Sequence, residues 1–335
     1  MKKVTVIGAG SWGTALAVLL AGNGNQVTLW GRKEDGIEET ARTRVNARFL
    51  PGVSIPYEIE VTADLDFAMS QTEMLVLSVP SQALRSVLRR IEHRVGNDVV
   101  IVNTAKGLEI GTHLRMSEVV RDTWGPDIHK RFAVLSGPSH AEEVGRRIPT
   151  AVVAASSYLS VARQVQDVFM SRCFRVYTSD DVIGVEMGGS LKNIIALATG
   201  ISEGLGFGDN TKAALLTRGL VEIIRMGVKV GARAQTFSGL SGLGDLVVTC
   251  NSRHSRNGRA GFLIGQGHNR EQVIEMIGMA VEGISTTKAA FEMSSELGLE
   301  MPITNIVYQV LFEDQPPGPA VWKLMERDKK DETLS

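Results

Sequence analysis

Hydrophobic runs alternate with amphipathic stretches over the first half of the chain. The runs are short and rich in β-branched residues, and the stretches between them have a helical period. Such alternation is typical of a parallel sheet, because each parallel strand needs a crossover, usually helical, to the next. The expected strands are Val4–Ile7, Val27–Trp30, Met74–Val79, Val99–Asn103, Phe132–Leu135, Ala151–Ala154 and Phe174–Tyr177. We therefore predict an α/β domain with a doubly wound sheet over residues 1–180.

The pattern changes past Asp180, where strand-like runs become rare. Long segments rich in Ala, Leu, Gly, Glu and Lys follow, with apolar residues at helical spacing. The expected helices are Val182–Gly204, Thr211–Val230, Arg270–Gly278, Thr286–Glu296 and Ile303–Glu313. Residues 181–335 are therefore predicted to form an all-helical second domain.

The first expected strand runs directly into the turn GAGSWG and then into an apolar helix. In this setting Gly8 permits the tight turn, Gly10 lets a pyrophosphate approach the backbone, and Gly13 lets the helix pack on the strand. The helix start presents N–H groups and the positive end of the helix dipole, so Ser11 and Trp12 are expected to contact the cofactor. A glycine-rich turn can be only a turn, but its place between strand and helix favours a Rossmann-type NAD(P) site.

The end of the second strand bears on which nucleotide binds. An acidic residue there pairs with the ribose hydroxyls of NAD and repels a 2′-phosphate. This chain has Gly31, Arg32 and Lys33 instead. The missing acid and the available cations predict that NADP is accepted and preferred, with Arg32 as the contact to the 2′-phosphate. The alternative is that Arg32 and Lys33 form a solvated surface pair.

Charge and composition narrow the class of ligand. The formal net charge is −1 over 335 residues, so no overall field attracts nucleic acid or an anionic membrane, and a small-molecule ligand is expected. Cys173 and Cys250 suggest neither a disulfide framework nor a metal site. The apolar run at the N-terminus is short and broken by glycine, unlike a secretory signal. We predict a cytoplasmic protein without membrane insertion.

Hydride transfer to or from an alcohol needs a proton acceptor beside the reacting carbon. Among the histidines only His140 follows a strand in a promising setting, whereas others, such as His113, lie in polar stretches expected to be exposed. Lys106, in NTAKGLE, and Lys192, in GGSLKNIIALATG, are better candidates. A lysine among glycines and aliphatic residues is partly desolvated and releases its proton more easily. Gly188 suggests that another group approaches this helix closely, against the alternative of a lysine at its solvent edge.

Long motifs in a fixed order resemble those of the NAD(P)-dependent glycerol-3-phosphate dehydrogenases of the bacterial soluble type. The motifs are GAGSWGTALA, LSVPSQALR, NTAKGLE, LSGPSHAEEV, GGSLKNIIALATGISEGLGFGDNTKAALLTRGL, SGLSGLGDLVVTCNSRHSRNGRAG and AVEGISTTKA. They cover nearly the whole chain, which is far more specific than the glycine motif alone. The resemblance implies reversible hydride transfer between NAD(P)H and dihydroxyacetone phosphate, giving sn-glycerol 3-phosphate for glycerophospholipid biosynthesis. It also implies a homodimer.

The resemblance further implies roles for residues in the two lysine motifs and in LSGPSHAEEV. Lys192 corresponds to the family's proton acceptor, and Lys106 to a second lysine at the substrate and the nicotinamide. Gly137 and Ser139 are expected near the substrate, and Ala141 on the cofactor side.

Three residues near the C-terminal motifs are implied to bind substrate or cofactor. Asp245, in GLGDL, corresponds to a carboxylate that binds the polar end of the substrate and helps to hold the lysine pair. Ala280 and Glu282 correspond to the family's cofactor-closing segment, although the family often has valine where Ala280 stands.

The stretch NSRHSRNGR is expected to be a loop that binds the substrate phosphate. Arginine beside serine and asparagine supplies charge and hydrogen bonds together, so Ser255, Arg256 and Asn257 are candidate anchors. The resemblance implies that Arg256 also reaches the cofactor. The alternative is a solvated basic loop.

Two other functions stay open. A dehydrogenase of the same architecture that acts on a 3-hydroxy acid would need a cationic clamp for a carboxylate and would have no need of Arg256 as a phosphate anchor. A nucleotide-binding sensor would bind cofactor without turnover, although the retention of Lys106 and Lys192 speaks against it.

Overall fold

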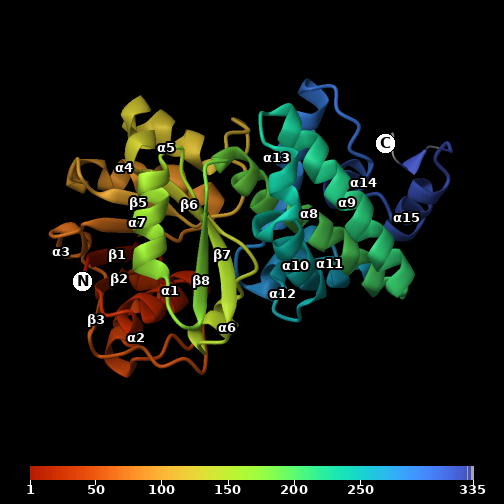
Figure 1. Ribbon diagram of the computed structural model, residues 1–335. Helices are drawn as coiled ribbons and strands as arrows, with labels where there is room; N and C mark the ends of the chain where they lie inside the picture. Colours follow the sequence, from red (N-terminus) through yellow and green to blue (C-terminus); the bar gives the residue numbers. More distant parts are fainter. Residues whose placement is uncertain (330, 333–335) are drawn as a thin grey trace. The chain divides into compact units, whose positions relative to one another are not determined.

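The computed structural model describes residues 1–329 and 331–332. The chain forms two compact units, visible in Figure 1. The first comprises Met1–Lys106 and Met116–Val185, and the second comprises Gly107–Arg115 and the residues from Glu186 onward. The sequence analysis divided the chain after residue 180 instead. Of its second domain, Lys330 and residues 333–335 lie outside the described residues.

The first unit is built on one eight-stranded sheet of order β3-β2-β1-β4-β5-β6-β7-β8 (Figure 1). Its strands are β1 (Lys3–Ile7), β2 (Gln26–Trp30), β3 (Ile59–Thr62), β4 (Met74–Leu77), β5 (Val100–Asn103), β6 (Phe132–Ser136), β7 (Thr150–Ala155) and β8 (Phe174–Ser179). The order reverses at β1, from which the chain first builds outward through β2 and β3 and then outward through β4. Such a switch point is where parallel α/β sheets bind their ligands.

Two features of the sheet differ from the sequence prediction. The strand β3 was not expected, because it is a four-residue edge strand with one fully buried side chain, Ile59, and so lacks a continuous apolar run. The strands β7 and β8 run against the other six, since β6 and β7 pair antiparallel. The helix that connects β6 to β7, α6 (Ala141–Gly145), has five residues and spans about 7 Å. This length is too short to carry the chain back for a parallel crossover.

The helices of the first unit follow from their apolar faces. The helix α1 is buried from Gly13 to Leu20 and packs against α6 and α7, as expected of a helix that is apolar all round. The helix α4 instead buries one stripe at helical spacing and leaves Arg89 and Arg90 exposed. The bounds are α1 (Ser11–Gly22), α2 (Ile37–Thr43), α3 (Leu65–Met69), α4 (Leu84–Ile91), α5 (Met116–Trp124) and α7 (Leu159–Phe169).

The second unit is helical, as predicted. Its helices are α8 (Val182–Gly204, which starts just before the unit), α9 (Asp209–Lys229), α10 (Asp245–Asn251), α11 (Arg256–Gly265), α12 (Arg270–Ile277), α13 (Glu282–Glu296), α14 (Pro302–Phe312) and α15 (Pro317–Met325). The short helices α10, α11 and α15 were not expected from the apolar pattern. Within the described part of the chain, no helix is both long and apolar enough to cross a membrane.

Glycines bring α8 and α11 together backbone to backbone. A Cβ atom on Gly200 would lie 2.2 Å from the carbonyl oxygen of Gly258, and one on Gly261 would lie 2.1 Å from that of Leu197. Glycine in a helix interior costs roughly 1 kcal/mol relative to alanine, so its repeated use here serves the close approach. The contact fixes α8, which carries Lys192, against α11, which begins at Arg256.

The segment Gly107–Arg115 forms a short hairpin that is attached to the helical unit. Leu108 and Arg115 form an antiparallel bridge, and Arg115 makes a 2.7 Å ion pair with Glu186. His113 lies 3.0 Å from Glu292 and 3.3 Å from Glu296 on α13. The expectation of an exposed His113 was wrong, since its side chain is 15% exposed. In sequence the hairpin directly follows Lys106, the last residue of the first segment of the other unit.

Glu222 on α9 caps the start of α14. Its carboxylate accepts hydrogen bonds from the N–H groups of Ile303 (2.6 Å) and Thr304 (3.1 Å) and from the Thr304 hydroxyl (2.9 Å). Burial raises the pKa of Glu222, and these donors oppose that shift. The carboxylate therefore takes the place of the capping side chain that α14 lacks at Met301.

We expect Glu222→Ala to destabilise the protein by about 3 kcal/mol, because the three donors would be left buried without an acceptor. Urea unfolding measures this change. Glu203→Ala, which removes a half-exposed partner of Lys212, is the control and should cost no more than about 1 kcal/mol. Equal, small losses in both variants would show that the cap contributes little.

Candidate active site

The glycine turn after β1 has the geometry expected of a pyrophosphate cradle. Gly8 has a φ of +111°, and a Cβ there would lie 2.4 Å from the carbonyl oxygen of Ser78. A Cβ on Gly13 would lie 1.9 Å from the Gly8 carbonyl oxygen, so the turn and the helix need both glycines. No atom lies within 4 Å of the Cβ position of Gly10. Gly8 and Gly13 therefore shape the turn, and Gly10 leaves open space in front of it.

The N-terminus of α1 adds hydrogen-bond donors to this cradle. Its N-cap, Gly10, has no capping side chain, and the first N–H groups of a helix have no partner within the helix. The indole Nε1 of Trp12 is buried and has no hydrogen-bond partner among the described residues. The Ser11 hydroxyl donates to the carbonyl oxygen of Phe49 at 2.5 Å. An anionic group would satisfy the helix donors, so this end of the sheet fits the phosphates of a dinucleotide.

Arg32 lies just past the carboxyl end of β2. Its side chain is 56% exposed, and its Nε donates to Asp35 Oδ2 at 2.7 Å. This hydrogen bond raises the pKa of Arg32. Lys33 pairs with Glu38 instead, at 2.9 Å. The sequence analysis found no acid at the strand end, whereas the turn that follows brings Asp35 back to it.

Lys106, Gly137 and Ser139 lie together in the first unit, at the carboxyl ends of β5 and β6. The Nζ of Lys106 and the hydroxyl of Ser139 both donate to the Gly137 carbonyl oxygen, at 3.0 and 2.9 Å. Gly137 has a φ of +145°, and a Cβ there would lie 2.9 Å from the Cα of Val152. Ala141 begins α6 a few residues later. Lys106, Gly137, Ser139 and Ala141, which are expected around the substrate and the nicotinamide, thus follow strands at one edge of the sheet.

Lys192 lies in the second unit and is 5% exposed, although it carries an ammonium group. Its Nζ donates to Asp245 Oδ1 and to the hydroxyl oxygen of Thr249, the latter at 2.7 Å. The Thr249 hydroxyl in turn donates to the Asp245 backbone carbonyl at 2.6 Å, so its lone pairs face the lysine. Asp245 is 1% exposed. The ammonium is therefore stabilised by a buried carboxylate and held in a defined direction.

The sequence analysis did not single out Thr249. The signal was its spacing, because residues four apart on a helix share a face and Thr249 follows Asp245 by four. One turn of π-helix, Leu240–Gly244, precedes α10 and places Asp245 at its start. A Cβ on Gly188 would lie 2.5 Å from the Ser241 carbonyl oxygen of this turn. The close approach expected at Gly188 is thus made by protein backbone.

Ser255, Arg256 and Asn257 do not form a loop. Ser255 is the N-cap of α11, where its Oγ accepts a hydrogen bond from the Gly258 N–H at 3.0 Å, and the next two residues open the helix. The loop expectation was wrong because a serine cap and the glycines of RNGRAG resemble a turn in sequence. The site residues gain the rigidity of a helix terminus.

Asn257 ties three helices of the second unit together. Its Nδ2 donates to Asn193 Oδ1 on α8 at 2.9 Å, and its Oδ1 accepts from the N–H of Gly283 on α13 at 2.8 Å. The neighbouring Arg256 donates to the carbonyl oxygen of Ala280 at 2.9 Å. The expected phosphate anchors therefore contact residues on both sides of Glu282, Ala280 and Gly283, in the segment where cofactor contacts are expected.

Cys250 follows Thr249 on α10 and has a buried thiol. Burial raises its pKa to about 11. Cys173 is partly exposed. Since the thiolate is the nucleophile, we expect a disulfide reagent at pH 8 to modify one thiol per native chain quickly and both thiols in denaturant. The absorbance of the group that the reagent releases gives the number of modified thiols. Cys173→Ala should abolish the fast phase and Cys250→Ala should leave it, and the reverse pattern would contradict the burial of Cys250.

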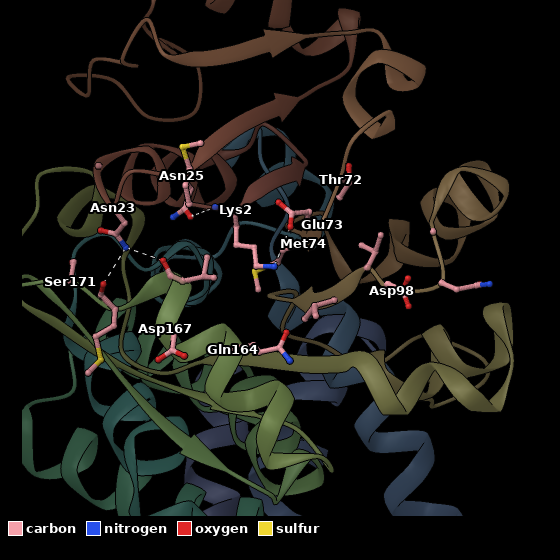
Figure 2. A pocket seen from close by; sticks show the side chains of 18 residues that line it. Lys2, Asn23, Asn25, Thr72, Glu73, Met74, Asp98, Gln164, Asp167 and Ser171 are labelled. Atoms are coloured by element: carbon pink, nitrogen blue, oxygen red, sulfur yellow. Dashed lines mark hydrogen bonds and ion pairs between the residues drawn. The ribbon is translucent and has the colours of Figure 1, made fainter.

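A hollow of about 910 Å³ is lined by residues at the starts of β1, β2, β4 and β5, at the opposite, amino edge of the same sheet. Figure 2 shows the side chains that line it. Some of its polar side chains are engaged with the protein: Lys2 pairs with Glu73 at 3.1 Å, and the Asn23 amide donates to carbonyls at the end of α7. None of the expected site residues lines it. Ligands of such sheets bind at the carboxyl edge, so we assign this hollow no role.

Comparison with known proteins gives one consistent family. Residues 3–162 match the NAD-dependent glycerol-3-phosphate dehydrogenase N-terminus, and residues 181–321 match the C-terminus of the same family. The glycerol-3-phosphate dehydrogenase (NAD(P)+) of Syntrophomonas wolfei is 54% identical over 99% of this chain and 97% of that protein. That of Carboxydothermus hydrogenoformans is 54% identical over 98% of each. The crystal structure of glycerol-3-phosphate dehydrogenase from Coxiella burnetii aligns with a TM-score of 0.93 at 40% identity, over 97% of this chain and 99% of that one.

Proposed function

The chain belongs to the NAD-dependent glycerol-3-phosphate dehydrogenases, and on this premise we propose that it interconverts dihydroxyacetone phosphate and sn-glycerol 3-phosphate with NAD(P)H. The observation that carries the proposal is the buried Lys192–Asp245–Thr249 group, which supplies a directed proton donor. In the direction of reduction the product would supply the glycerol backbone of phospholipids.

The glycine turn and its surroundings would hold the cofactor. Gly8, Gly10 and Gly13 shape the cradle, and the first turn of α1, with Ser11 and Trp12, would face the pyrophosphate. The remaining contacts are assigned to Arg32, Lys106, Ala141, Arg256, Ala280 and Glu282. When bound, the nicotinamide supplies or accepts the hydride at C2 of the substrate.

Lys192 would give a proton to the C2 oxygen during reduction and take it back during oxidation. The Asp245 carboxylate favours the ammonium, which is the form needed to donate, and Thr249 fixes its direction. Lys106 would polarise the same oxygen and stabilise the charge that develops on it. Its hydrogen bond to the Gly137 carbonyl, which Ser139 shares, limits the positions that its Nζ can take.

Arg256 and Asn257, with Ser255, would bind the substrate phosphate. The guanidinium offers several donors, while the Asn257 amide is already oriented by Asn193 and Gly283. Binding energy gained at the phosphate then holds C2 in place for reaction.

We expect Arg256→Ala to raise the KM for dihydroxyacetone phosphate about tenfold or more, because a charge-assisted contact to the phosphate is lost. Steady-state kinetics measures the change. Arg259→Ala is the matched control, since this exposed arginine lies on the same helix and should leave KM unchanged. A KM that stays normal in Arg256→Ala would contradict the phosphate assignment.

The reaction itself is tested by NADPH oxidation, followed by absorbance, with dihydroxyacetone phosphate beside unphosphorylated dihydroxyacetone. We expect rapid oxidation that depends on the phosphate. Turnover of a 3-ketoacid instead would favour the hydroxy-acid dehydrogenase, and NADPH binding without turnover of any ketone would favour a sensor.

Three further features complete the proposal. Arg32 favours NADPH over NADH, which kinetics with both cofactors would test. By family resemblance the enzyme would act as a cytoplasmic homodimer. Light scattering on the purified protein tests the oligomeric state, and cell fractionation tests the compartment.

A further inference from the structure

A turn that follows α2 is anchored directly on the glycine cradle. Asn46 is 2% exposed, and its Nδ2 donates to the carbonyl oxygen of Ala9 at 2.8 Å and to the Thr14 hydroxyl at 2.9 Å. Three residues later the Phe49 carbonyl accepts from the Ser11 hydroxyl at 2.5 Å. Both anchors belong to the turn and first helix that would face the cofactor phosphates. Arg48, which lies between Asn46 and Phe49, therefore extends from a backbone that is anchored on both sides.

The side chain of Arg48 converges with that of Arg32 on one carboxylate. Asp35 Oδ2 accepts from Arg32 Nε at 2.7 Å, and Asp35 Oδ1 lies 3.7 Å from Arg48 Nη1. Each carboxylate oxygen thus faces a different guanidinium. Both arginines are 56% exposed, whereas Asp35 is 23% exposed. Arg32 Nη1 also lies 3.8 Å from Glu34 Oε1.

We infer that Arg48 is a second specificity-determining residue for the cofactor and that, with Arg32, it binds the adenosine 2′-phosphate of NADP(H). The place is the carboxyl end of β2, where a dinucleotide-binding sheet receives the adenosine ribose. Two guanidiniums that already share a carboxylate can exchange it for a phosphate, which carries more charge and more acceptor oxygens. This inference rests on the proposed function, because it assumes that the cradle binds NAD(P).

Asp35 would then have a different role with each cofactor. When the ribose carries a free 2′-hydroxyl, Asp35 balances the charge of the two arginines and can accept a hydrogen bond from the sugar, as acids at this position do. When the ribose carries a 2′-phosphate, the arginines turn to the phosphate and Asp35 competes with it. The arrangement accounts for use of both cofactors by one site.

The test measures binding of two nucleotides to the full-length protein by titration calorimetry. Adenosine 2′,5′-bisphosphate carries the 2′-phosphate, and adenosine 5′-monophosphate lacks it. We expect Arg48→Gln to weaken binding of the bisphosphate about tenfold and to leave that of the monophosphate unchanged. Asp35→Asn should tighten binding of the bisphosphate. Arg42→Gln is the control, because Arg42 on α2 is an exposed arginine that pairs with Glu39.

Unchanged bisphosphate binding in Arg48→Gln, or equal weakening of both nucleotides, would overturn the inference. The same preparations are assayed for NADPH oxidation with dihydroxyacetone phosphate. If Arg48→Gln oxidises NADPH and still prefers the bisphosphate to the monophosphate as the wild type does, the role of Arg48 is refuted and the proposed function stands. If the wild-type protein does not oxidise NADPH, but Arg48→Gln abolishes its preference for the bisphosphate, only the proposed function is refuted.

Discussion

Replacement of Lys192 by methionine is expected to lower kcat about a thousandfold while NADPH still binds. General acid/base groups contribute roughly 10²–10⁴-fold to rate, and Lys192 is the buried proton donor of the proposed reaction. Methionine keeps the length and apolar stem of the side chain, so the helix and its packing should persist. Stopped-flow and steady-state assays give kcat, and the fluorescence of bound NADPH gives the dissociation constant.

Lys229→Met is the matched control for this variant. Lys229 lies at the exposed end of α9 in the same unit, and its replacement should leave both constants unchanged. A Lys192→Met enzyme with nearly normal kcat would remove Lys192 from the acid/base role. A parallel loss of NADPH binding would show instead that the lysine supports the cofactor site.

Removal of Asp245 is expected to have the largest effect on stability. Asp245→Ala would leave the buried ammonium of Lys192 without its carboxylate, and a buried charge that loses its partner costs about 3–5 kcal/mol. Activity should fall as well, because Lys192 would lose its direction. Urea unfolding and thermal melts measure the stability change.

A double variant separates these two effects. Lys192→Met combined with Asp245→Leu removes both charges and fills the space with apolar atoms, so it should regain most of the lost stability and no activity. A double variant as unstable as Asp245→Ala would contradict the view that the unpaired charge causes the loss.

The fold class could be predicted from sequence because its signals are local. Seven of the eight strands contain short runs rich in apolar and β-branched residues, and the helix expected at Val182–Gly204 has those bounds in the structure. The family and the use of NAD(P) were likewise predicted from motifs and are confirmed by the comparisons. The missed strand β3 and the reversed pair β7 and β8 depend on edge position and connection length, which apolar periodicity does not record.

The site could be predicted less completely from sequence, because its contacts join residues that are far apart along the chain. The pairing of Lys192 with Asp245 spans 53 residues and was implied only by family resemblance. Arg48 carries no local signal, since an arginine in a turn is common. The four-residue spacing of Thr249 from Asp245 becomes informative only once both residues are known to lie on one helix, and α10 was not expected. Asp35 was overlooked because a turn after β2 brings it back to Arg32. The roles of all these residues stay predictions.

The backbone contact between α8 and α11 has a consequence for substrate size. Lys192 lies two turns before Gly200 on α8, and Asn257 directly precedes Gly258 on α11. Because carbonyl groups and Cα atoms form the contact, no change of rotamer can widen it. The separation between the proposed proton donor, Lys192, and the proposed phosphate anchor, Asn257, is then fixed by the backbone of the unit. We expect ketone phosphates with one additional carbon between carbonyl and phosphate to bind without reacting.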